Sequence, residues 1–166
     1  MMKNWFNQAV RSHERPLTRY VKNLLRALPP AQEVVQETFL KLWKHGPFEA
    51  ERPQKVWLYK TSRNHAIDII RKEDKMSTLT QEQEEELSCP NEIPSVRLEK
   101  KQLEKFVLDL VKELPPKTQD MVRLKFQEGL SYKEISSITG ESTNSVGVTL
   151  HRAILHLRAA AEKGEK

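Results

Sequence analysis

The chain has 166 residues, of which 28 are Lys or Arg and 23 are Asp or Glu, so its formal charge is +5. No apolar run approaches the roughly 20 residues that cross a bilayer, and the first residues lack the apolar segment and cleavage site of a secretory signal. We therefore expect a cytoplasmic protein with no membrane insertion. One cysteine and five histidines leave little with which to build a disulfide or a zinc site, so no metal is expected.

The charge is unevenly distributed along the chain. Residues 1–75 carry 15 basic and 8 acidic groups (net +7), residues 76–100 carry 2 and 6 (net −4), and residues 101–166 carry 11 and 9 (net +2). The middle block is rich in Glu, Gln, Ser and Pro and can bury little apolar surface, which favours a flexible acidic linker between two domains. A long solvated loop inside one domain is the alternative.

Apolar residues recur at helical spacing in both halves, and no sustained period-two alternation predicts strands, so the expected fold is all-α. Proline and glycine bound three helices in the first half, over about 17–28, over 31–45 and from 53 to beyond residue 70. The first of them is expected to begin near Pro16. Three helices with short connections form a small bundle.

The second half carries the apolar stripes of four more helices. The predicted core positions are Leu103, Phe106, Val107, Leu110, Val111, Leu114, Met121, Val122, Leu124, Phe126, Ile135, Ile138, Val146, Leu150, Ala153 and Leu157. Gly129 stands where a left-handed residue ends a helix, and Ser131 with Glu134 has the spacing of a capping box that begins the next one.

The last two helices have the spacing of a helix-turn-helix. Such a motif needs a small residue in its first helix, a glycine in the turn and an apolar residue in the second helix, and Ser136, Gly140 and Val146 occupy these places. Ser142 or Thr143 is expected to cap the second helix. A helical hairpin that does not bind DNA is the alternative, because many such hairpins have a central glycine.

If the motif binds DNA, the N-terminal part of its second helix lies nearest the bases. The candidate contacts to DNA on this helix are Thr143, Asn144, Ser145, Val148, Thr149, His151 and Arg152. Amide, imidazole and guanidinium groups suit base readout, and hydroxyl groups near a helix N-terminus suit phosphates. Simple capping is an equally good interpretation of Thr143 and Ser145. Val148 faces outward, so it contacts either a thymine methyl group or another protein.

Three motifs, in order along the chain, resemble one protein family. Residues 31–43 (AQEVVQETFLKLW) look like the polymerase-clamp-binding helix of extracytoplasmic-function sigma factors. Residues 56–71 resemble the helix with which that family melts promoters and reads the −10 element. Residues 114–119 and 129–135 are similar to the start of its −35-reading domain. The resemblance extends from about residue 17 to residue 158.

The resemblance implies a protein that binds core RNA polymerase and promoter DNA, is held by an anti-sigma partner, needs no cofactor and is not an enzyme. It implies two small helical domains joined by a flexible acidic linker. Region 2 would occupy residues 1–75, the linker residues 76–100, and region 4, with the helix-turn-helix, residues 101–166.

The resemblance also assigns site residues in the first half. The contacts to core polymerase are assigned to Glu33, Gln36, Glu37, Phe39 and Trp43. In the next helix, Lys60, Arg63, Arg71 and Lys72 form a basic set suited to neutralise phosphates, and Asn64 stands where the family contacts an extruded −10 base. The alternatives are that both aromatic residues belong to the bundle core, and that Glu37 and Asn64 are solvated surface groups.

The segment 46–55 corresponds to the part of the family that captures the extruded base, with Pro47, Phe48 and Arg52 as candidate contacts. Trp57 is suited to stack on an opened base, although a core position is the stronger interpretation.

The recognition helix departs from the family pattern at residues 147–149. Gly, Val and Thr stand there where the family often has a basic, a small polar and a second basic residue, so two cations are missing and weaker contacts to phosphates are expected. A stand-alone helix-turn-helix regulator and a helical adaptor with no DNA role are the rival functions. No phosphate-binding glycine loop, nucleophile–base pair or metal-ligand spacing favours an enzyme.

Overall fold

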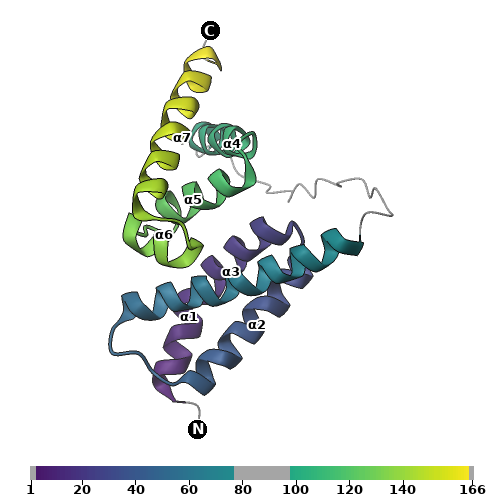
Figure 1. The fold of residues 1–166 in the computed structure, drawn as a ribbon, viewed down its shortest axis with the longest axis vertical. Helices are drawn as coiled ribbons and strands as arrows, with labels where there is room; N and C mark the ends of the chain where they lie inside the picture. The colour runs from purple at the N-terminus through teal and green to yellow at the C-terminus, as the bar shows by residue number, and fades with distance from the viewer. Residues whose placement is uncertain (1–2, 77–97, 165–166) are drawn as a thin grey trace.

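The computed structural model describes residues 3–76 and 98–164, which form seven α-helices and no strand (Figure 1). The helices are α1 Asn4–Leu25, α2 Leu28–His45, α3 Glu51–Met76, α4 Leu98–Lys112, α5 Pro116–Phe126, α6 Tyr132–Thr139 and α7 Thr143–Gly164. The all-α prediction is confirmed. Both ends of the range predicted as a linker, 76–100, are helical, and the rest of it, 77–97, lies outside the described residues. No helix in the described ranges is long and apolar enough to cross a membrane.

The first helix begins at Asn4, and Pro16 lies inside it rather than at its start. The prediction of its start is wrong because an internal proline weakens a helix by about 3 kcal/mol but does not always end it. The turns before the proline are held by packing: His13 is buried, and Trp5 and Phe6 are partly buried against the core.

The other two helices of the first half form where they were predicted, but α2 begins at Leu28, which was predicted to end the first helix, and not at residue 31. The proline pair at residues 29–30 lies in the first turn of α2, where a missing N–H costs little because these donors have no partner within the helix. Gly46 ends α2 with a φ of 94°, and its amide donates to the Leu42 carbonyl at 3.0 Å. Together α1, α2 and α3 form a three-helix bundle that buries Leu17 and Leu58.

The capping box predicted for α6 is confirmed. The Ser131 hydroxyl accepts a hydrogen bond from the Glu134 amide at 3.1 Å, and the Glu134 carboxylate accepts one from the Ser131 amide at 2.9 Å. Gly129 and Gly140 have φ values of 68° and 79°, the left-handed conformation in which a glycine is least strained.

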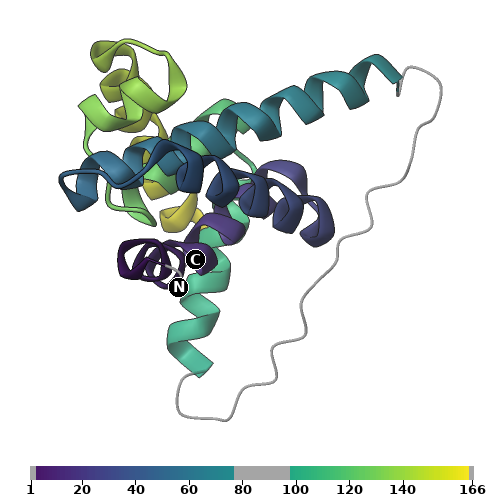
Figure 2. The same cartoon turned by 90° about the horizontal axis from the view of Figure 1, so that it is seen from below.

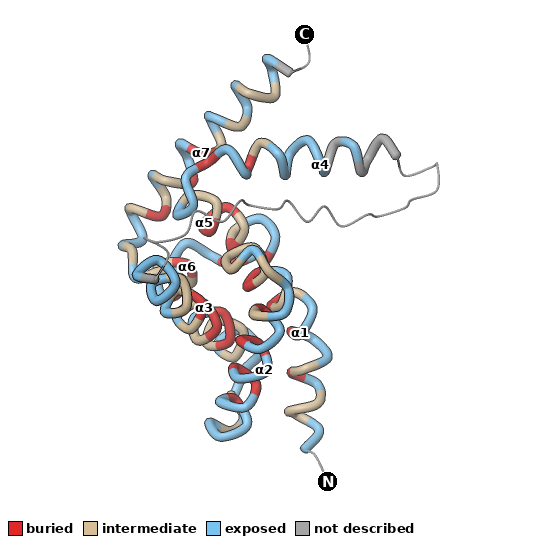
Figure 3. Tube along the Cα trace, turned by 90° about the vertical axis from the view of Figure 1, so that its right-hand side faces the viewer, coloured by how far each residue is buried: buried red, intermediate tan, exposed pale blue. Residues whose placement is uncertain are grey.

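Three residues predicted to lie in the core are exposed. Phe106 and Val107 lie on α4, which Figure 3 shows to be mostly exposed, and Phe126 ends α5 with 58% of its surface exposed. Among the residues of this stripe whose side chains the structure describes, only Val111 and Leu114 are buried, and Leu103 lies outside them. Periodicity identifies the apolar face of a helix, but the extent to which neighbours cover that face depends on tertiary packing.

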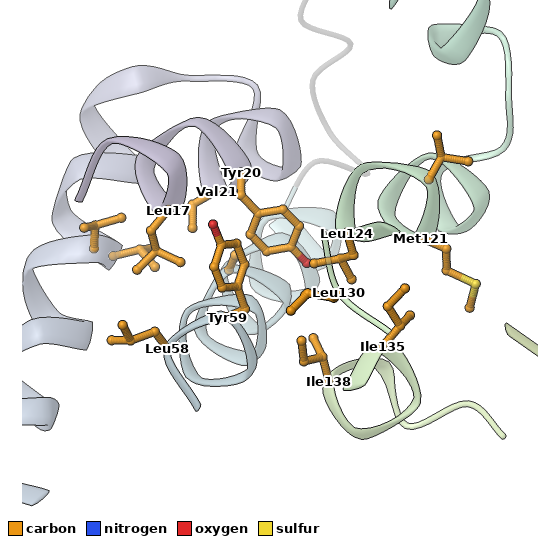
Figure 4. Packing of buried hydrophobic residues seen from close by; sticks show 14 of the residues in the cluster. Leu17, Tyr20, Val21, Leu58, Tyr59, Met121, Leu124, Leu130, Ile135 and Ile138 are labelled. Atoms are coloured by element: carbon orange, nitrogen blue, oxygen red, sulfur yellow. The ribbon is translucent and has the colours of Figure 1, made fainter. Parts of the chain in front are cut away.

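The two halves are in close contact. Helix α6 packs against α3, as two perpendicular views show (Figures 1 and 2). Buried apolar side chains from both halves form one cluster, in which Tyr20 and Tyr59 point into the junction between the two groups of helices (Figure 4). The second half contributes Leu124 and Leu130, among other residues, to the same cluster. The helices of the first half therefore pack against those of the second half. We call this arrangement the closed chain.

Candidate nucleic-acid and protein interfaces

The exposed face of α2 carries most of the residues assigned to protein binding. Glu33, Gln36 and Glu37 are exposed, and Trp43 exposes 43% of its surface. Phe39 differs, because only 7% of its surface is exposed and its ring meets Phe6 edge-on at 6.4 Å. The structure thus brings four of the five residues to one surface and leaves Phe39 beneath it.

The beginning of α1 extends this surface. The ring of Trp5 stacks on Trp43 with centroids 6.3 Å apart, and Phe6 meets Trp43 edge-on at 5.1 Å. The ammonium group of Lys3 lies 6.0 Å from the Trp43 ring, within reach of a cation–π interaction. Sequence reasoning missed these residues because they precede the position at which the first helix was expected to begin.

Glu37 also has a neighbour on α3. Its Oε2 lies 3.2 Å from Nδ1 of His65, while 57% of its side chain remains exposed. The carboxylate is therefore positioned from one side and is still accessible to a partner from the other.

The basic set on α3 divides into two groups. Its exposed members are Lys60, Arg71 and Lys72, and the neighbouring Asn64 is exposed as well. Arg63 is different, because only 15% of its side chain is exposed and its Nε donates to Oδ2 of Asp120 on α5 at 2.8 Å.

The residues of the segment 46–55, which extends into α3, also fall into two groups. Phe48 stacks on His45 with centroids 4.4 Å apart and lies 5.9 Å from Trp57, so these rings form a partly buried aromatic group. Arg52, by contrast, reaches the second half, where its Nε donates to Oε2 of Glu134 at 3.1 Å. This ion pair and burial act on the pKa of Glu134 in opposite directions. Burial raises it, and the hydrogen bonds from Arg52 and Ser131 lower it by more.

Asp120 is one of two buried carboxylates that join the halves. It is 5% exposed and accepts hydrogen bonds from the Tyr20 hydroxyl at 2.6 Å and from Arg63. Burial, together with the adjacent carboxylate, raises the pKa of Tyr20 well above its ordinary value. The tyrosine therefore stays protonated and acts as a donor across the interface.

Glu128, just after α5, is the second buried carboxylate, also 5% exposed. It accepts from the Tyr59 hydroxyl at 2.5 Å and from Nη2 of Arg19 at 3.0 Å, and Lys55 donates to its backbone carbonyl at 2.6 Å. Burial, with the hydrogen bond to Glu128, raises the pKa of Tyr59. Neither Asp120 nor Glu128 is marked by a local sequence pattern, because their partners are 57 to 109 residues away along the chain.

The N-terminal part of α7 presents the residues assigned to DNA reading. Ser142 caps the helix, since its hydroxyl accepts from the Ser145 amide at 3.0 Å. The exposed members of the set are Thr143, Asn144, Val148, His151 and Arg152, and the partly buried ones are Ser145 and Thr149. All but these last two line one shallow hollow, together with Tyr132 and Gly147. The structure therefore brings most of the predicted set to one accessible face.

Tyr132 is a part of this face that sequence reasoning missed. A Cβ atom at Gly147 would lie 3.6 Å from its ring, so the ring rests beside the helix where a side chain is lacking. The ammonium group of Lys125 lies 5.1 Å from the ring centroid. A tyrosine beside α7 thus supplies aromatic surface where the helix itself supplies none.

An acidic residue precedes the same helix. Glu141 pairs with Lys117, and the hydrogen bond from that lysine lowers the pKa of the carboxyl group. The Ser145 hydroxyl lies 3.4 Å from the same carboxylate. Ser145 is therefore less available to a phosphate than the exposed Thr143.

Two segments of the chain match family models. Residues 9–76 match Sigma-70 region 2, and residues 107–157 match Sigma-70, region 4. The chain belongs to the sigma-70 family. Helices α1–α3 correspond to region 2, and the end of α4, all of α5 and α6 and most of α7 correspond to region 4.

Curated relatives assign this sigma factor to the extracytoplasmic-function group. It is 26% identical over 157 residues to the ECF RNA polymerase sigma factor SigL of Mycobacterium tuberculosis, covering 91% of this chain and 85% of that one. It is 28% identical over 156 residues to the RNA polymerase sigma factor SigV of Bacillus subtilis, covering 93% and 89%. The recognition made from the sequence motifs is confirmed.

Two solved structures share the fold. The sigma factor RpoE of Bartonella quintana, in complex with the anti-sigma factor NepR, matches with a TM-score of 0.73 and 19% identity, covering 95% of this chain and 96% of that one. CnrH, in complex with the cytosolic domain of CnrY, matches with a TM-score of 0.59 and 20% identity, covering 95% and 88%. At this identity, the likeness concerns the fold alone.

Proposed function

We propose that this sigma factor binds core RNA polymerase through the exposed face of α2, the −10 element through α3 and the −35 element through α7, and that it performs no bond-making chemistry itself. The observation that carries the proposal is the presence of regions 2 and 4 in one chain, each with its assigned residues largely on an accessible face.

The polymerase surface consists of polar groups around an aromatic centre. Trp43 and Trp5 form the stacked centre, and Gln36 and Glu37 lie on the exposed face of the same helix. Protein interfaces commonly place aromatic anchors within a polar rim, and the anchors contribute most of the binding energy. Phe39 supports the surface from below through Phe6 and is not itself a contact.

Reconstitution with core polymerase tests this surface. Trp43→Ala is expected to weaken binding by more than tenfold, because truncation of an aromatic anchor typically costs 2 kcal/mol or more. Gln36→Ala combined with Glu37→Lys removes two polar contacts and is expected to weaken binding as well. Glu14→Lys, which makes the same charge change on an exposed part of α1, is the control. Full binding by both altered proteins would refute the α2 assignment.

The DNA surfaces differ in the chemistry they offer. On α3, Lys60, Arg71 and Lys72 are exposed cations suited to phosphates, and Asn64 is an exposed amide suited to a base edge. On α7, Arg152 and Asn144 are exposed beside Tyr132. Promoter profiling with the holoenzyme and with Asn64→Ala and Arg152→Ala tests the two assignments separately. Each substitution is expected to alter sequence preference at its own promoter element.

The remaining parts of the proposal concern organisation and partners. Region 2 is assigned to residues 1–75, a linker to 76–100 and region 4 to 101–166. Because polymerase and promoters are cytoplasmic in bacteria, this protein is assigned to the cytoplasm. An anti-sigma partner is proposed, and it is supported by the fold shared with RpoE and CnrH, both solved in complex with other proteins.

A further inference from the structure

Region 4 pairs with two arginines of region 2 that the sequence analysis assigned to DNA. Arg63, from the basic set of α3, donates to Asp120, and Arg52, from the base-capture segment, donates to Glu134. The Arg63 guanidinium group is held by the buried Asp120 and cannot at the same time hold a phosphate through the same N–H group, whereas the Arg52 pair lies at the exposed edge of the contact. In the closed chain this part of region 2 is therefore unavailable to DNA.

The donors that surround the two buried carboxylates form a set suited to phosphate oxygens. Asp120 accepts from one arginine and one tyrosine hydroxyl, Arg63 and Tyr20, at 2.8 and 2.6 Å. Glu128 accepts from a second such pair, Arg19 and Tyr59, at 3.0 and 2.5 Å. Arginine and tyrosine donors are among the groups that bind DNA phosphates, and arginine binds carboxylate and phosphate with the same planar fork.

We propose that Asp120 and Glu128 occupy two phosphate-binding positions on region 2, so that region 4 and a DNA backbone compete for one surface. The first position consists of Arg63 and Tyr20, and the second of Arg19 and Tyr59. The inference rests on the proposed function only in identifying the competing DNA as the −10 strand. The closed chain is then a form that excludes this strand, and DNA binding requires region 4 to leave.

The chemistry of the contact allows the exchange. A buried ion pair contributes little net stability, because the cost of removing both charges from water offsets most of their attraction. An incoming phosphate that replaces each carboxylate keeps the arginine and the tyrosine satisfied. Lys60, Arg71 and Lys72 are exposed in the closed chain and can hold DNA before the exchange occurs.

The first test changes the carboxylates to amides in the full chain, Asp120→Asn with Glu128→Gln. Small-angle X-ray scattering is expected to give a larger radius of gyration than for the wild-type chain. Affinity for a fluorescein-labelled thymidine 20-mer is expected to increase at least tenfold. Asp109→Asn with Glu162→Gln removes the same charge from exposed positions and corrects for the general electrostatic gain. An unchanged radius, or an affinity no higher than that of this control, would overturn the proposal.

The second test holds the chain closed. Arg52→Cys with Glu134→Cys, in a Cys89→Ser background, places thiols at an exposed edge of the contact. A short reagent with two methanethiosulfonate groups links them, and a reductant releases them. The linked protein is expected to bind the 20-mer at least tenfold more weakly than the same protein after reduction. Equal binding before and after reduction would overturn the proposal, and this comparison is independent of the folding of the amide variant.

The outcome for the proposed function is measured separately. Wild-type chain and core polymerase are mixed, and promoter-directed transcription is recorded. If region 4 and the 20-mer compete for region 2 but no promoter is transcribed, the phosphate-binding positions stand and the proposed function fails. If transcription is observed and competition is not, the proposed function stands and this inference fails.

Discussion

The two surfaces that are proposed to bind DNA differ in accessibility. The face of α7 that is assigned to the −35 element is open, with Asn144, Val148 and Arg152 exposed. The surface assigned to the −10 element is partly covered, because Arg63 and Arg52 are paired with region 4. The groups that cover the region 2 surface belong to region 4. Region 4 therefore leaves its own α7 face exposed while it covers the surface of region 2 that is assigned to the −10 element.

The distribution of charge explains why the covering occurs in this direction. Residues 1–75 carry a net charge of +7, and residues 101–166 carry +2 with nine acidic groups. Two of these acids, Asp120 and Glu128, lie against the basic region 2. The domain with the excess of cations thus attracts either the carboxylates of region 4 or DNA phosphates.

Removal of a buried carboxylate is expected to weaken the contact between the two domains more than any other change. Asp120→Ala leaves Arg63 buried without a counter-charge, and such a loss typically costs 3–5 kcal/mol. The domains can separate and let the arginine hydrate, so we expect a loss at the lower end of this range. The free energy of unfolding should fall by about 3 kcal/mol, as measured by urea denaturation. Asp109→Ala removes an exposed carboxylate of α4 and is expected to stay within about 0.5 kcal/mol. Equal effects of the two substitutions would contradict the closed arrangement.

Alkaline pH is a second way to weaken the contact. The pKa values of Tyr20 and Tyr59 are raised in the folded chain, so the unfolded chain loses these protons first. The stability that these tyrosines contribute is therefore complete below about pH 10 and falls as the pH rises above it, by about 1.4 kcal/mol per pH unit for each tyrosine. Urea denaturation between pH 9 and pH 11 measures the slope.

The controls for this pH dependence are the phenylalanine variants. Tyr20→Phe and Tyr59→Phe each remove one ionisable hydroxyl, and each is expected to reduce the slope above pH 10. Lysines titrate in the same range, but they do so equally in all three proteins. A slope that is unchanged in both variants would show that neither tyrosine is held neutral by the interface.

How much could be predicted from the sequence depends on the range of the interaction. The capping box of Ser131 and Glu134, the left-handed glycines and the exposed Val148 follow from neighbours within a few residues, and all three predictions are confirmed. The start of α1 could not be predicted, because the packing of Trp5 and Phe6 outweighs the helix-breaking tendency of a proline.

The site was predicted in the same uneven way. Family motifs identified the faces of α2 and α7 because their residues recur at helical spacing within one element. The pairing of Arg63 with Asp120 joins residues 57 positions apart, and no local pattern marks it. Phe39 shows the same limit, since spacing places it on the face of α2 and only the position of Phe6 makes it buried.

The open face of α7 can be altered without disturbing the covered one. Gly147 lies inside α7, and a Cβ atom there meets the Tyr132 ring at 3.6 Å, an ordinary contact distance. Gly147→Ala is expected to raise the free energy of unfolding by about 1 kcal/mol, the usual gain for this change inside a helix. Thermal denaturation measures the gain, and the scattering radius is expected to stay unchanged. A loss of stability would indicate that Tyr132 cannot accommodate the methyl group.

The smallest expected effect concerns the exposed edge of the contact between the domains. Only 19% of the Glu134 side chain but 57% of the Arg52 side chain is exposed, and pairs at such positions contribute about 0.5 kcal/mol or less.

The pKa of Glu134 is lowered in the folded chain, so its contribution to stability is complete above its ordinary pKa and is lost as the pH falls through the lower folded value. Urea denaturation at pH 7 and pH 3 is expected to show this loss in the wild-type chain. Glu134→Gln preserves the hydrogen bond to the Ser131 amide but has no charge to lose, so its stability should fall by a few tenths of a kcal/mol less. A larger difference between the two proteins would mean that the exposed edge, and not the buried carboxylates, holds the domains together.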